Sequence, residues 1–162
     1  LCDRFVKGCK DMLLPGFMIG LANTAIVLLQ NANVLDTILH SLAGLLNRLP
    51  GGLMGIGMFV MHEVFNVLVP SGSAQAAATM PLMVPLADRV GLTRQTAVLA
   101  FQLGDAFTNV FSPTGGEILA ALAICKVPFS KWLRFLLPIF ALWWVVALLF
   151  LVYATQSGFG PF

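Results

Sequence analysis

Long apolar runs separated by short polar segments dominate this chain between residues 12 and 154. Met12–Gln30 and Phe135–Ala154 contain no charged residue, and a helix that crosses a bilayer needs roughly 20 consecutive apolar residues. We therefore predict that each of these two segments, 12–30 and 135–154, forms a membrane-spanning helix.

Residues 33–50 separate their apolar and polar side chains in a different way. Leucine, isoleucine and valine recur every three or four positions, while Asp36, His40 and Asn47 fall on the other face of the predicted helix. Such a pattern predicts an amphipathic helix that lies along the membrane interface. The helix is expected to end at Pro50.

Residues 53–87 form two apolar arms that meet at the polar turn Pro70-Ser-Gly-Ser73. The second arm, residues 74–87, is too short to cross a bilayer as a helix. We therefore predict a re-entrant hairpin, which enters the membrane and turns back. Irregular backbone at membrane depth is tolerated only where protein or a water-filled cavity satisfies its N–H and C=O groups. The turn is consequently expected to line a ligand site.

Residues 93–125 have the pattern of a helix that is interrupted at Ser112-Pro-Thr-Gly-Gly116. Neither half spans a membrane comfortably by itself, but the two halves and the loop together do. We predict a discontinuous transmembrane helix here. The whole chain, residues 1–162, is then one all-α integral membrane domain with the order span, interface helix, re-entrant hairpin, discontinuous helix and span.

The composition excludes a soluble domain and a nucleic-acid-binding protein. Hydrophobic residues make up 59% of the chain and charged residues 10%, whereas a soluble domain typically has about 25% charged residues. The net charge of +2 is small and its basic residues are dispersed, so the expected surroundings are a lipid bilayer and not nucleic acid. The three cysteines have no metal or disulfide spacing, and no cofactor is expected apart from a coupling Na⁺ or H⁺.

The distribution of basic residues agrees with this topology. Six of the nine fall in the two segments that the hairpin arrangement places in the cytoplasm, as the positive-inside rule requires. They are Arg4, Lys7, Lys10, Lys126, Lys131 and Arg134.

Several motifs resemble those of YfcC-type carriers. These motifs are Pro70–Ala76, Thr79–Asp88, Arg94–Asp105 and Pro113–Gly115. The YfcC-type family is grouped with anaerobic C4-dicarboxylate carriers and arginine/ornithine-antiporter-like proteins of the ion transporter superfamily. The resemblance implies a multi-pass protein of the bacterial inner membrane, in which this chain is the C-terminal repeat and an inverted N-terminal repeat is its partner. It also implies a homodimer assembled through the amphipathic helix.

The hairpin turn at 70–73 and the helix interruption at 112–116, together called the two interruptions, have the polar groups expected of a transport site. The hairpin turn has hydroxyls, an amide and the positive end of a half-helix, which favours an anionic group such as a substrate carboxylate. Freed carbonyls and hydroxyls at the second interruption suit a Na⁺ near Ser73 and Thr114. The alternative is that both interruptions are structural turns. The residues expected to bind substrate or ion are Ser71, Gly72, Ser73, Gln75, Gln102, Asp105, Asn109, Ser112, Thr114 and Gly115.

Two acidic residues in the apolar segments each have more than one possible role. Asp105 shares a helix face with Gln102 and Asn109, and a carboxylate in a membrane is costly unless it is paired or hydrated. It is expected either to bind a cation, proton or substrate amine, or to fix the position of the hairpin through hydrogen bonds. Glu63 follows His62, but Asn66 replaces the second histidine of a zinc-protease motif. Glu63 is expected either to carry a proton or to form a polar edge against another part of the carrier.

These features predict a secondary active transporter for small carboxylates or amino acids, working by ion-coupled symport or exchange and by elevator-like alternating access. One alternative is an intramembrane serine hydrolase that uses Ser71 or Ser73, but no base is well placed to activate either hydroxyl. Another is a non-transporting scaffold or channel subunit, which would not require two matched helix interruptions. We therefore predict a carrier and not an enzyme.

Overall fold

The computed structural model describes residues 2–113 and 115–160, with the backbone alone for residues 11, 14, 15, 18, 19, 22, 23, 25, 26, 30 and 35. All regular structure in this part of the chain is helical, as predicted. The helices are α1 (Cys2–Asn31), α2 (Val34–Leu46), α3 (Gly51–Leu68), α4 (Gly72–Val90), α5 (Arg94–Phe111), α6 (Gly116–Cys125) and α7 (Phe129–Ser157).

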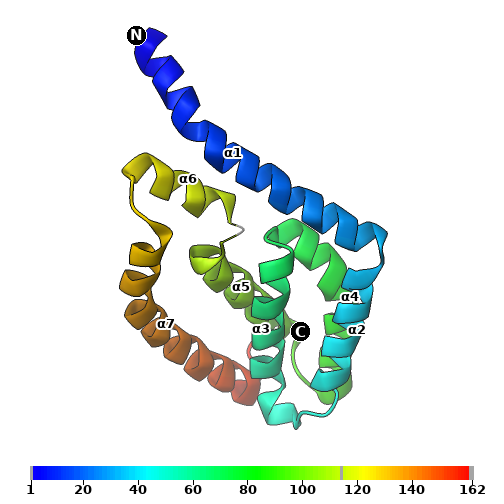
Figure 1. The fold of residues 1–162 in the computed structure, drawn as a ribbon. Helices are drawn as coiled ribbons and strands as arrows, with labels where there is room; N and C mark the ends of the chain where they lie inside the picture. The colour runs from blue at the N-terminus through cyan, green and yellow to red at the C-terminus, as the bar shows by residue number, and fades with distance from the viewer. Residues whose placement is uncertain (1, 114, 161–162) are drawn as a thin grey trace.

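Helices α3 and α5 lie at the centre of the bundle (Figure 1). Helix α3 makes its most extensive contacts with α5 and also packs against α7 and α4. Helix α2 packs against α3 and α4, and the long helix α1 crosses one side of the bundle, where it contacts α6. The α3–α4 turn and the α5–α6 interruption both face the side where α1 runs (Figure 1).

Small residues let the central helices approach one another closely. A Cβ atom added at Gly104 of α5 would lie 2.6 Å from the Cβ of His62 and 3.0 Å from the carbonyl oxygen of Phe59, both on α3. A Cβ atom at Gly55 of α3 would lie 2.7 Å from Oγ1 of Thr155 on α7. Membrane helices associate largely through this kind of close packing, so these glycines let α3 pack closely against α5 and α7.

Two helices in the described part of the chain, α3 and α7, are long and apolar enough to cross a membrane. The predicted span at 135–154 lies inside α7. The second hairpin arm, residues 74–87, was predicted to be too short to cross a bilayer. The helix observed there, α4, is longer than this segment: it has 19 residues, which corresponds to roughly 28 Å of helix. Its length therefore does not exclude a crossing. What distinguishes α4 from α3 and α7 is its more polar composition, including Asp88 and Arg89 in its last turn.

A polar turn joins α4 to α5. Gly91 ends α4 with a φ of 75°, a conformation that glycine adopts without steric cost. Arg94 donates two hydrogen bonds to Asp88, at 2.9 and 2.8 Å, and these bonds lower the pKa of the Asp88 carboxyl. Thr93 caps α5 by accepting a hydrogen bond from the backbone N–H of Thr96. The sequence between α4 and α5 thus stabilises both helix ends.

We expect Gly104→Ala to destabilise the protein because its methyl group would force α3 and α5 apart. Overpacking of this kind costs about 1–3 kcal/mol. Gly44→Ala in α2 is the matched control, since a Cβ atom there has no atom within 4 Å. Thermal unfolding in detergent should show a lower midpoint for Gly104→Ala alone. Equal midpoints for the two variants would contradict the close approach of α3 to α5.

Candidate functional site

The turn between α3 and α4 and the interruption between α5 and α6 line one pocket of about 310 Å³. Two segments that lie far apart in the sequence therefore meet at one place. The residues that line the pocket are Pro70, Ser71, Gly72, Asn109, Gly115, Gly116 and Glu117.

The local sequence explains the geometry of the α3–α4 turn, which we call the hairpin tip (residues 69–72). Pro70 has no N–H and disfavours helical backbone at the residue before it, so α3 ends at Leu68. Ser71 is extended, with a φ of −145°, and α4 begins directly after it. Its side chain makes no capping hydrogen bond to α4. The first N–H groups of α4 therefore need other partners at the tip.

Asp105 of α5 occupies the space beside the hairpin tip. A Cβ atom added at Gly72 would lie 2.8 Å from Oδ2 of Asp105. Asn66 of α3 donates a hydrogen bond from Nδ2 to Oδ1 of Asp105, and Asn109 donates to the same oxygen at 3.2 Å. The carboxylate thus lies at the N-terminal end of α4, where the helix dipole favours negative charge.

The second interruption also has an acidic residue near a helix N-terminus, but this residue belongs to the helix itself. Helix α5 ends at Phe111, before Pro113, and the N–H of Gly115 donates to the carbonyl oxygen of Ser112 at 3.1 Å. Helix α6 begins at Gly116, and Glu117 lies in its first turn. Glu117 is therefore placed at the positive end of the α6 dipole. In the described residues, a carboxylate accompanies the N-terminus of each half-helix at the pocket.

The predicted site residues divide into three groups. Ser71, Gly72, Asn109 and Gly115 line the pocket, and Asp105 contacts it through Gly72 and Asn109. The others lie elsewhere or outside the described residues. Ser73 and Gln102 are exposed, Ser112 is buried at the end of α5, and Thr114 lies outside the described part of the chain.

Gln75, another predicted site residue, joins the two arms of the hairpin. It is buried, and its Nε2 donates to the carbonyl oxygen of His62 at 3.0 Å. This contact places Gln75 between α3 and α4, away from the pocket lining. Of the two residues near which a Na⁺ was predicted, Ser73 and Thr114, the second lies outside the described part of the chain.

Four residues at or beside the pocket were not among the predicted site residues. Pro70, Gly116 and Glu117 belong to the lining, and they flank the predicted turn residues in the sequence. Asn66 holds Asp105 from the neighbouring helix. An uncharged amide in an apolar helix was the available signal for Asn66, but its partner on α5 is 39 residues away, so the sequence did not reveal the pair.

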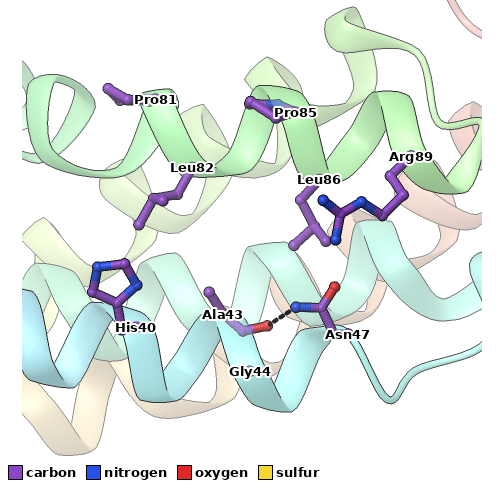
Figure 2. Close-up of a pocket in the computed structure, with 9 residues that line it drawn as sticks. All are labelled: His40, Ala43, Gly44, Asn47, Pro81, Leu82, Pro85, Leu86 and Arg89. Carbon is purple, nitrogen blue, oxygen red and sulfur yellow. Dashed lines mark hydrogen bonds between the residues drawn. The ribbon is translucent and has the colours of Figure 1, made fainter.

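A second cavity, of about 300 Å³, lies between α2 and α4. Figure 2 shows His40 on α2 and Asn47, the residue directly after α2, facing Leu82 and Arg89 on α4. The Asn47 side chain turns back to its own helix and donates to the carbonyl oxygen of Ala43 at 3.1 Å (Figure 2). The walls of this cavity are regular helix faces. The pocket at the two interruptions, where unwound backbone and two carboxylates gather, is therefore the stronger candidate for a solute site.

A family model described as C4-dicarboxylate anaerobic carrier matches residues 1–156. The chain belongs to this carrier family. It is similar to the Escherichia coli (strain K12) protein named "Putative basic amino acid antiporter YfcC", with 36% identity over 164 residues, covering 98% of this chain and 32% of that protein. It is also 31% identical over 138 residues to an uncharacterized protein of Haemophilus influenzae, covering 85% of this chain and 27% of that protein. No solved structure gives a significant match.

Membership in the carrier family confirms the resemblance to YfcC-type proteins. A family of carriers also agrees with the predicted class of protein, a transporter. This carrier-family chain spans about a third of the length of the curated relatives that it matches. The residues that line the pocket therefore come from a segment that matches only part of the length of each relative.

We expect Gly72→Ala to destabilise the carrier through a clash with Asp105, by about 1–3 kcal/mol. In an Asp105→Ala background the same methyl group should cost much less, because the opposing carboxylate is gone. A double-mutant cycle of thermal stability measures this coupling. An equal cost of Gly72→Ala in both backgrounds would show that the carboxylate does not lie against the tip.

Proposed function

We propose that this chain forms one half of a secondary carrier in the bacterial inner membrane that transports small amino acids with a cationic side chain. The observation that carries the proposal is the position of Asp105 at the N-terminal end of α4, beside the pocket. A negative charge already occupies the place where the sequence pattern alone suggested a substrate carboxylate.

The charges around the pocket favour a cationic group. Asp105 and Glu117 compensate the dipoles of α4 and α6, and no lysine or arginine is among the described residues that line the pocket. In the part of the cavity that this chain forms, a dicarboxylate would meet two carboxylates and no cation among the described lining residues, and like charges repel one another. A guanidinium or ammonium group would find an acceptor in either carboxylate. The name of the Escherichia coli relative, a basic amino acid antiporter, supports the same substrate class.

The backbone and neutral polar groups suit the amino acid end of such a substrate. Ser71 supplies a hydroxyl, and Gly115 and Gly116 present backbone without side chains to the pocket. Glycine allows close approach of a ligand to backbone groups. The volume of about 310 Å³ is at the lower end of the range for small-molecule sites, and the inverted N-terminal repeat would complete the cavity.

The hydrogen bonds favour movement of the pocket as one body. Asn66 and Asp105 join α3 to α5, and Gln75 and His62 join the two hairpin arms. In the proposed elevator-like cycle, the hairpin and the broken helix move together against a scaffold of α1, α2 and α7. Homodimerisation through α2, and coupling to Na⁺ or H⁺ or to exchange, are parts of the same proposal.

Transport by proteoliposomes that contain the complete carrier tests the substrate class. We expect exchange of radiolabelled arginine, and inhibition by other cationic amino acids but not by succinate. Asp105→Asn should reduce arginine affinity by roughly 10–100-fold, since a hydrogen bond to a charged group contributes about 1.5–3 kcal/mol. Gln102→Ala on the same helix is the control, because this side chain is exposed outside the pocket lining.

Two results would contradict the proposal. Succinate uptake without arginine uptake would assign the pocket to dicarboxylates. Full arginine exchange by a double variant that combines Asp105→Asn with Glu117→Gln would show that neither carboxylate recognises the substrate.

A further inference from the structure

Glu63 is an acidic residue that the proposed substrate site does not use. It lies in α3, a helix apolar enough to cross a membrane, and its side chain is partly buried. Aromatic rings surround this part of the bundle: Phe59 contacts Phe107 and Trp144, with ring centroids 5.9 and 5.7 Å apart. A carboxylate in such apolar surroundings is costly unless it is paired or protonated.

The hydrogen-bond partner of Glu63 is neutral. Nε1 of Trp144 on α7 lies 2.9 Å from both carboxyl oxygens and donates to them. In the described part of the chain, the ion pair found is that of Arg94 with Asp88, at the α4–α5 turn, and no cation pairs with Glu63. An indole N–H can donate to a carboxylate and also to the carbonyl oxygen of a neutral carboxyl group. The Trp144 contact is therefore compatible with both protonation states.

The other ionisable groups on the neighbouring helices leave Glu63 without a counter-ion. On α3, His62 is directed toward α4 and α5, where it contacts Gln75 and Phe101.

The α7 sequence around Trp144 has no ionisable residue between Arg134 and Tyr153. Asp36 and His40 on α2 are exposed, as are Asp88 and Arg89 in the last turn of α4 and Arg94 in the first turn of α5. Lys131, Arg134 and Tyr153 on α7 are exposed as well. Apart from these groups, Asp105 of α5 is the remaining ionisable residue on these helices, and it is an acid.

Glu63 and the substrate pocket are mechanically connected. Oγ1 of Thr108 on α5 donates to the backbone oxygen of Glu63 at 3.3 Å. Asn66, which follows Glu63 by three residues on α3, donates to Asp105. The turn of α3 that carries Glu63 is thus joined to the turn of α5 that carries Asp105. Two negative charges on these adjoining turns repel each other in a medium of low dielectric constant.

We propose that Glu63 is the proton-binding site of this carrier, with Trp144 as its hydrogen-bond donor, and that it exchanges a proton for the cationic substrate. The proposal rests on the proposed function. When a cationic substrate neutralises Asp105, the repulsion between the two acids falls and Glu63 releases its proton. When the substrate leaves, a proton returns to Glu63. Binding of the proton and binding of the substrate affect each other equally. Protonation of Glu63 therefore weakens substrate binding by the same factor by which the substrate weakens proton binding.

Trp144 itself can report the protonation of Glu63. The chain has three tryptophans, and Trp132→Phe with Trp143→Phe leaves Trp144 as the single tryptophan of this chain, with any tryptophan outside it also replaced. We expect the Trp144 fluorescence of the complete carrier in detergent to follow a one-proton titration curve. The curve should be absent in Glu63→Gln, which keeps an acceptor oxygen for the indole, and should persist in Glu63→Asp. Saturating arginine should move the midpoint to lower pH, because the cation favours the charged form of Glu63.

The controls separate the proton site from the substrate class. Asp105→Asn should keep a Trp144 titration but lose its response to arginine. A titration that persists unchanged in Glu63→Gln, or a native signal that is independent of pH, would overturn the proton site. A Glu63-dependent titration that no cationic amino acid shifts, in a carrier that does not exchange arginine, would support proton binding at Glu63 and reject the proposed substrate class.

Transport provides an independent measurement. In proteoliposomes, Glu63→Gln should retain arginine–arginine exchange but lose arginine uptake driven by a pH gradient. Retention of pH-driven uptake by this variant would overturn the proposal. Thermal unfolding that matches the native protein would show that the loss does not come from misfolding. If Glu63→Gln does not fold, Glu63→Asp replaces it, and its uptake should show a pH profile displaced from that of the native carrier.

Discussion

The position of one carboxylate connects the two irregular segments of this bundle. Asp105 receives hydrogen bonds from Asn66 on α3 and Asn109 on its own helix, and it lies against Gly72, the first residue of α4. The partial positive charge at the N-terminus of α4 and the two amide donors together stabilise the Asp105 carboxylate, whose charge would be costly in an apolar setting. Because Asp105 contacts the hairpin tip and Asn109 lines the pocket, this interaction sets both the shape and the charge of the site.

Close packing of the helices makes that interaction possible. Gly104 lies one residue before Asp105 and lets α5 approach α3 closely. With a larger residue there, Asn66 and Asp105 would be held farther apart. The same contact between α3 and α5 includes the hydrogen bond from Thr108 to the backbone of Glu63. The packing that positions Asp105, the proposed substrate-binding acid, thus also positions Glu63, the proposed proton site. Exchange of a proton for a cation would then have a direct physical route between the two acids.

The sequence predicted most of the helix pattern but few of the contacts. The interruption predicted at 112–116 lies between the end of α5 at Phe111 and the start of α6 at Gly116, because proline and glycine act locally on the backbone. The length of α4 was misjudged, since helical backbone continues from Gly72 to Val90 beyond the uncharged residues. The role of Asn66 depends on a tertiary contact with Asp105 that no local pattern encodes. Asp105 itself was predicted to bind a ligand or to fix the hairpin, and the structure shows its hydrogen bond to the first hairpin arm.

Substrate protection of a thiol at the hairpin tip tests most directly whether the two interruptions form one solute pocket. Cys2, Cys9 and Cys125 are exposed, so each is first replaced by serine, along with any cysteine elsewhere in the complete carrier, and Ser71→Cys is then introduced. A water-soluble maleimide should label this thiol, and saturating arginine should slow the labelling in this variant but not after Asp105→Asn. Labelling of Ser71→Cys that arginine leaves unchanged, in a carrier that still exchanges arginine, would contradict the account.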